Sequence, residues 1–185
     1  GAVTPIGNSV EDFWTNVKKG VCGIDYPTLF DGKDSKAKLF AEIKDLKLED
    51  HFRKKQILRT DRFCQIGIIA AREAFDDSGL YHADIDKNRL GVVMGNGVGG
   101  INTITQETIN LHSGGMNTVS PLLVAKSLSN ILAGNISIEF GAKGISNAVI
   151  TACAAGTNAI GEAFRSIQYN DADIVMCGGS EACIN

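Results

Sequence analysis

The chain has 185 residues, 44% of them hydrophobic and 21% charged, which is enough to build one globular domain with a buried core. A net charge of −3 excludes the positive excess typical of nucleic-acid-binding domains. Apolar runs such as 66–71 are too short to cross a bilayer and no signal segment is evident, so we expect no membrane contact and a cytoplasmic location. Five cysteines without a Cys-x-x-Cys pair, and three scattered histidines, predict neither disulfides nor a metal site, and we expect no cofactor.

Helical spacing predicts two helices early in the chain. The first begins after Ser9, a good N-cap, and ends at Gly20. Its apolar side carries Phe13, Trp14 and Val17. The second covers residues 61–78 and ends before Gly79, because Gly readily takes the left-handed conformation that stops a helix.

Short apolar strands alternate with helices in the rest of the chain. The expected strands are 90–94, 148–151 and 174–177. The expected helices are 101–111, 122–138 and 154–168, the last with Ile160, Phe164 and Ile167 on one side. Strands that alternate with helices predict a layered α/β fold.

A cysteine stands where the second expected strand passes into a helix. Unpaired amides and the helix dipole place partial positive charge around Cys153, which favours a thiolate nucleophile. Free cysteines are also among the most buried residues, so position alone fits a structural cysteine equally well. In both cases we expect Cys153 to be buried in the first turn of the helix, and as a nucleophile it would lie at the foot of a narrow pocket.

A glycine-rich loop follows the first expected strand. Gly95-Asn96-Gly97-Val98-Gly99-Gly100 fits the Gly-x-Gly-x-x-Gly fingerprint of dinucleotide-binding proteins and precedes a helix, as that fingerprint requires. The fingerprint also needs an acidic residue about 20 positions on, and 117–120 offers none. A nucleotide-binding oxidoreductase fragment therefore stays open beside an ordinary tightly packed turn.

Several motifs together resemble the elongating β-ketoacyl-acyl-carrier-protein synthases of type II fatty-acid synthesis, synthases I and II, and synthase II most of all. The motifs are 4–10, the loop 95–100, Thr151-Ala152-Cys153-Ala154-Ala155-Gly156 with 158–163, and Asp171-Ala172-Asp173 leading to Gly178-Gly179-Ser180-Glu181-Ala182. They occur in the family's order and the resemblance covers essentially the whole chain. It implies a thiolase-like αβαβα fold, of which 1–185 would be the N-terminal half, trimmed at both ends, and it implies a homodimer.

The resemblance also implies an activity. Cys153 would take an acyl group from an acyl carrier protein bearing phosphopantetheine and then receive the carbanion formed when a malonyl group loses CO₂. The Cys153 amide would be one oxyanion-hole donor, and Val98 would line the acyl pocket where the family often has Ile. A non-catalytic partner such as a chain-length factor is a further alternative, although such partners typically lack the cysteine.

Basic residues gather before the second helix, at Arg53, Lys54, Lys55, Arg59 and Arg62. A solvated charged face is their usual explanation. By the resemblance, Lys55 and Arg59 would instead help to dock the acidic carrier protein. Asn117 and Thr118 stand where the family often has a second basic pair, which weakens this assignment.

The remaining cysteines and the histidines receive no catalytic role. We expect Cys177 and Cys183 to fill the core, Cys64 to lie beside the apolar side of the second helix, and Cys22 to lie in a loop. The family's two catalytic histidines and lysine belong to a C-terminal half beyond residue 185. The histidines present here, His51, His82 and His112, match none of them and are expected at the surface.

Overall fold

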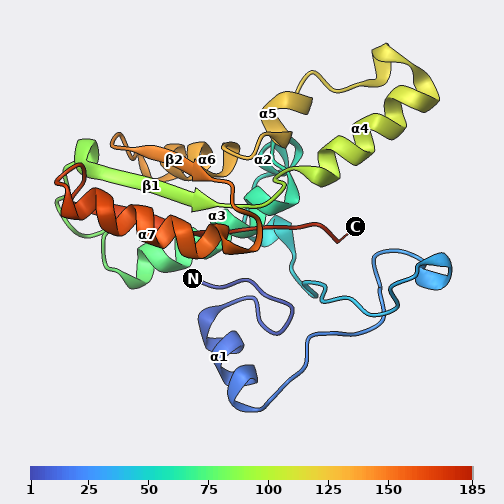
Figure 1. Ribbon diagram of the computed structural model, residues 1–185, viewed down its shortest axis with the longest axis horizontal. Helices are drawn as coiled ribbons and strands as arrows, with labels where there is room; N and C mark the ends of the chain where they lie inside the picture. The colour runs from blue at the N-terminus through green and yellow to red at the C-terminus, as the bar shows by residue number, and fades with distance from the viewer. Residues whose placement is uncertain (185) are drawn as a thin grey trace.

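The computed structural model describes residues 1–184, and a small parallel sheet with helices on both faces forms its centre (Figure 1). The strands are β1 (Leu90–Gly95), β2 (Ser146–Val149) and β3 (Ile174–Gly179), arranged in the order β2-β1-β3. Val92 of β1 pairs with Ser146 on one side and Met176 on the other. The predicted α/β class is confirmed.

Seven α-helices and five short 3-10 turns surround the sheet in residues 1–184. The helices are α1 (Val10–Lys18), α2 (Lys54–Arg59), α3 (Arg62–Asp77), α4 (Ile101–Gly114), α5 (Leu123–Ser127), α6 (Ile131–Phe140) and α7 (Ala155–Gln168). The turns are Gly32–Asp34, Leu48–Asp50, Lys87–Arg89, Met116–Thr118 and Ala152–Ala154. None of the helices in this part of the chain has the length and apolar character needed to cross a membrane.

The central strand is buried on both faces, and its alternating side chains face two different layers. Leu90, Val92 and Met94 belong to the larger core with α3 and α6. Val93 packs with Ala159 and Ala163 of α7 in a smaller one. Figure 1 shows α7 along one face of the sheet and α3 and α6 on the other.

Helix α7 places its small residues on the sheet and its large apolar residues outward. Ala159 is fully buried and Ala163 nearly so, because alanines let the helix approach the strands closely. Ile160, Phe164 and Ile167 are 56%, 66% and 47% exposed. These three were predicted to share one side of the helix; that side does not face the sheet. Helix α7 therefore has an apolar side that the described chain leaves uncovered.

The predicted helix over 122–138 is wrong in one respect, because the chain breaks between α5 and α6. The Ser127 carbonyl accepts a hydrogen bond from the Gly100 amide at 3.1 Å, and the Ser129 carbonyl accepts one from Asn96 Nδ2 at 2.7 Å. A helix through 128–130 would compete for these carbonyls. The glycine-rich loop therefore determines where the helix stops.

The other predicted elements hold with small shifts. Ser9 caps α1 by accepting from the Asp12 amide at 3.1 Å, and Asp61 caps α3. The second strand ends at Val149, two residues earlier than predicted, so residues 150 and 151 leave the sheet before the next turn.

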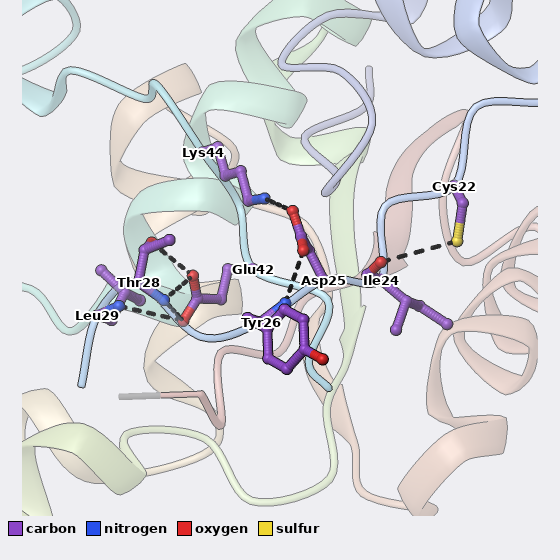
Figure 2. A network of polar contacts seen from close by, with 8 residues as sticks. All are labelled: Cys22, Ile24, Asp25, Tyr26, Thr28, Leu29, Glu42 and Lys44. Carbon is purple, nitrogen blue, oxygen red and sulfur yellow. Dashed lines mark hydrogen bonds and ion pairs between the residues drawn. The ribbon is translucent and has the colours of Figure 1, made fainter. Parts of the chain in front are cut away.

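Between α1 and α2 the chain makes a long excursion that polar contacts hold together (Figure 2). Glu42 is 2% exposed and accepts hydrogen bonds from the Thr28 amide at 2.9 Å, the Thr28 hydroxyl at 2.7 Å and the Leu29 amide at 3.2 Å. The Thr28 hydroxyl is the main reason that the pKa of Glu42 lies below its usual value. Asp25 pairs with Lys44 at 3.1 Å and exchanges backbone hydrogen bonds with Phe40.

Candidate active site

Cys153 lies on a strained turn between β2 and α7. The turn Ala152–Ala154 directly precedes the helix, and Ala152 has a φ of +52°, a left-handed conformation that side chains with a Cβ disfavour. From the first turn of α7, Asn158 Nδ2 donates to Thr151 Oγ1 at 2.8 Å. Strain of this kind persists only where its surroundings enforce it, so the turn holds Cys153 in a defined place.

The thiol itself is exposed, which corrects the prediction of a buried cysteine. Cys153 also lines none of five hollows found in residues 1–184, so the predicted narrow pocket is not seen at any of these. The reason is that the strand ends at Val149, so the turn lies beyond the end of the sheet, where nothing in the described chain covers it.

Three glycines fix the height of this turn above the sheet. A Cβ on Gly95, at the end of β1, would lie 2.3 Å from the Ala155 carbonyl, and one on Gly179, at the end of β3, would lie 2.9 Å from Gly156 Cα. Backbone atoms therefore pack directly on backbone atoms where α7 begins. Gly156 of the cysteine motif thus packs against Gly95 and Gly179, the last residues of β1 and β3.

The glycine-rich loop surrounds a carboxylate from the same chain. Glu181 accepts hydrogen bonds from the amides of Gly97 at 2.6 Å, Val98 at 2.8 Å and Gly99 at 3.3 Å. Successive amides that converge in this way form an anion-binding nest, the feature by which a dinucleotide fingerprint holds a pyrophosphate. Because the side chain of Glu181 fills the nest, the geometry opposes the nucleotide-binding alternative.

The loop and the cysteine turn are neighbours at the same end of the sheet. A Cβ on Gly97 would lie 3.5 Å from Ala152 Cα, so the predicted site residues Val98 and Cys153 stand on adjoining loops. Val98 is 48% exposed. In the sequence, Glu181 is distinguished only as part of a motif, as an acid two residues after the Gly-Gly pair that ends the strand.

The two predicted docking residues lie on α2. Lys55 and Arg59 are exposed, and within residues 1–184 neither forms an ion pair. Arg62 begins α3 and is half-buried, and burial lowers its pKa. Gln65 joins the two helices, because its Nε2 donates to the carbonyls of Ile57 at 3.2 Å and Thr60 at 3.0 Å. The basic helix is thus a fixed, solvent-facing feature.

The other thiols and the histidines are placed apart from this site. Cys64, which was predicted beside the apolar side of the second helix, is buried in α3. Cys177 and Cys183 are exposed, so the prediction that they fill the core is wrong. Cys177 lies in β3, an edge strand of the described sheet, and Cys183 follows that strand, so no further strand of the described chain covers either of them. All three histidines are exposed, as predicted. In residues 1–184 no three His, Cys, Asp or Glu side chains are grouped as metal ligands would be.

Comparison with known proteins shows which family and which relatives the chain resembles. Residues 1–185 match the family model "Beta-ketoacyl synthase, N-terminal domain". The chain is 45% identical over 184 residues to a 3-oxoacyl-[acyl-carrier-protein] synthase 2 of Staphylococcus aureus and 37% identical to one of Synechocystis. In each case the match covers all of this chain but 44% of the relative, so the chain spans less than half the length of these curated relatives.

Solved structures give the same fold. The ishigamide ketosynthase/chain length factor superposes with a TM-score of 0.90 at 26% identity, covering 100% of this chain and 46% of the other. A type II polyketide ketosynthase, solved in complex with its acyl carrier protein and bound to a hexaketide, superposes with a TM-score of 0.83 at 26% identity, covering 98% and 48%. The thiolase-like α/β fold is thereby confirmed for the described half.

Proposed function

The chain belongs to the β-ketoacyl synthase N-terminal domain family, and from this premise we propose that the whole protein is a 3-oxoacyl-[acyl-carrier-protein] synthase of fatty-acid biosynthesis. The observation that carries the proposal is Cys153, an accessible thiol on a strained turn at the start of a helix. That is where a covalent acyl intermediate needs its nucleophile.

The proposed reaction has two transfers. Cys153 Sγ attacks the thioester carbonyl of an acyl carrier protein, a new thioester forms and the carrier thiol leaves. A malonyl group on a second carrier then loses CO₂, and its carbanion attacks the Cys153 thioester. The Cys153 thiol is released, and a 3-oxoacyl chain two carbons longer stays on the carrier. The Cys153 amide is our proposed donor to the oxyanion of the first transfer.

Substrate and partner contacts complete the proposal. Val98, exposed beside the cysteine turn, would touch the acyl chain. Lys55 and Arg59 would attract the acidic carrier protein, since both are exposed without counter-ions in the described chain. The similar ketosynthase that was solved with its acyl carrier protein supports a partner of this kind. Family membership is our basis for proposing a cytoplasmic homodimer.

The test is whether Cys153 becomes acylated. The full-length protein is incubated with an acyl carrier protein bearing a radiolabelled or mass-tagged acyl group, and its peptides are analysed by mass spectrometry. We expect a stoichiometric adduct on the Cys153 peptide, and we expect Cys153→Ala to lose both the adduct and elongation while the fold is kept. Cys177→Ala, which removes another exposed thiol, is the control and should keep both. Elongation by the Cys153→Ala protein would refute the proposal.

A further inference from the structure

We propose that Glu181 is a positioning residue for the acyl site: its carboxylate clamps the glycine-rich loop against the Cys153 turn and thereby sets which acyl chain lengths are accepted. The inference rests on the proposed function, because it concerns the pocket that the acyl group on Cys153 would occupy. Glu181 has no role in the proposed chemistry and does not act on the substrate directly.

The clamp uses both oxygens of the carboxylate. Oε2 accepts from the amides of Gly97 and Val98, and Oε1 accepts from that of Gly99. Hydrogen bonds to a charged acceptor are shorter and stronger than neutral ones, and the 2.6 and 2.8 Å distances agree with that. No other side chain of residues 1–184 bonds to these three amides.

The opposite side of the loop is held independently. The Gly100 amide donates to the Ser127 carbonyl, and Ser129 Oγ donates to the Val98 carbonyl at 3.3 Å. Loss of Glu181 would therefore leave the loop attached at one side and free at the side that faces Ala152. The expected result is a wider range of loop positions, without collapse of the fold.

Glu181 is itself anchored to the sheet. The preceding residue, Ser180, donates its amide to the Gly95 carbonyl at 3.0 Å and its hydroxyl to the Phe63 carbonyl at 2.7 Å. Because Ser180 is bonded to β1 and α3, the carboxylate of Glu181 holds the glycine-rich loop in a fixed position relative to these two elements. Val98, the loop residue beside the cysteine turn, is the side chain whose position depends on it.

This geometry predicts an effect that depends on chain length. An acyl chain long enough to reach Val98 needs the loop in place, whereas a two- or four-carbon chain on Cys153 does not. In the full-length protein we expect Glu181→Gln to lower kcat/KM for a long acyl donor about 10-fold and for a short donor less than 2-fold. Glu162→Gln, an exposed acid on α7, is the matched control and should leave the ratio unchanged.

Two further measurements test the clamp, and the first does not rely on turnover. Hydrogen exchange of the Gly97 and Val98 amides should be slow in the unsubstituted protein and faster in Glu181→Gln. In Glu181→Ala the vacated nest should bind a small carboxylate, so added acetate should restore the long-donor rate, while chloride at equal ionic strength should not.

The outcomes separate this inference from the proposed function. If the unsubstituted protein forms no Cys153 adduct, the proposed function fails. If the adduct forms, the clamp is refuted by fast exchange at Gly97 and Val98 in the unsubstituted protein. It is equally refuted by an unchanged ratio of long to short donors in Glu181→Gln, or by equal loss with both donors that acetate does not restore.

Discussion

At the scale of single residues, two cysteines of the chain differ in solvent exposure because their surroundings differ. Cys153 is exposed on a turn that lies beyond the sheet. Cys64 is fully buried in α3, and burial, aided by the nearby charge of Asp61, raises its pKa to about 12. Sequence position alone left open which kind of cysteine Cys153 is; its exposure and the φ of Ala152 support our proposal that it is the nucleophile.

We expect Cys64 to make folding stability depend on alkaline pH. Its folded pKa lies above the ordinary value of 9.0, so its contribution is complete below pH 9 and is lost as pH rises toward 12. The loss can reach on the order of 4 kcal/mol. Urea unfolding between pH 7 and 10.5 should show a steeper decline for the unsubstituted protein than for Cys64→Ala. Identical slopes would contradict this, as would fast alkylation of native Cys64 at pH 8.

The site could be predicted only in part at this scale. The position of Cys153 could be predicted because a short apolar run followed by small residues marks a strand-to-helix turn. The role of Glu181 could not, because its three amide partners are more than 80 positions away in the sequence. No local pattern reports contacts of that range.

At the scale of elements, periodicity predicted where the helices and strands lie in the sequence, but not which side of α7 packs on the sheet. The spacing of Ile160, Phe164 and Ile167 predicted α7 correctly, yet the alanines pack on the sheet. Hydrophobicity ranks the larger residues as more buried, whereas close approach of helix and strand requires small ones. The break between α5 and α6 could not be predicted from local spacing either. The glycine-rich loop that donates hydrogen bonds to the Ser127 and Ser129 carbonyls lies about 30 residues earlier in the sequence.

The contact between α7 and the strand ends predicts a graded series of alanine substitutions. Gly95→Ala would collide with backbone and should cost about 3 kcal/mol, and Gly179→Ala, with a 2.9 Å approach, about 1 to 2 kcal/mol. Gly156→Ala should be nearly neutral, because its Cβ would meet atoms no closer than 3.6 Å. Gly161→Ala, in open space within the same helix, should stabilise by about 0.5 to 1 kcal/mol. Thermal unfolding in another order would overturn this account.

Helix α2 predicts a defect specific to the carrier protein. Lys55→Glu with Arg59→Glu should raise KM for acyl-carrier-protein substrates roughly 5-fold at low salt and hardly change KM for a small acyl thioester. The difference should shrink as salt is added, because the charges are exposed. Lys18→Glu with Lys19→Glu makes the same change in net charge at α1 and is the control. Equal losses with both substrates would show that α2 matters for folding instead of docking.

At the scale of the whole molecule, the described chain holds the proposed nucleophile, Cys153, but no group placed to stabilise the enolate of the proposed reaction. The enolate formed by decarboxylation needs preorganised donors. His51, His82 and His112 are exposed and lie outside the cysteine turn and the glycine-rich loop. We therefore expect residues 1–185 alone to form no 3-oxoacyl product. Adding a complementary C-terminal fragment should restore turnover, and substantial turnover by residues 1–185 alone would contradict the proposed division of labour.

The outward face of α7 has a consequence for how the protein is made. Ile160, Phe164 and Ile167 would leave the ribosome before any later segment could cover them. In a protein as long as its curated relatives, this chain would be less than half of the product. At about 5 to 20 residues per second, the wait would be roughly 10 to 50 s. Nascent chains of this length should therefore recruit a ribosome-associated chaperone, and Phe164→Ser should weaken that recruitment.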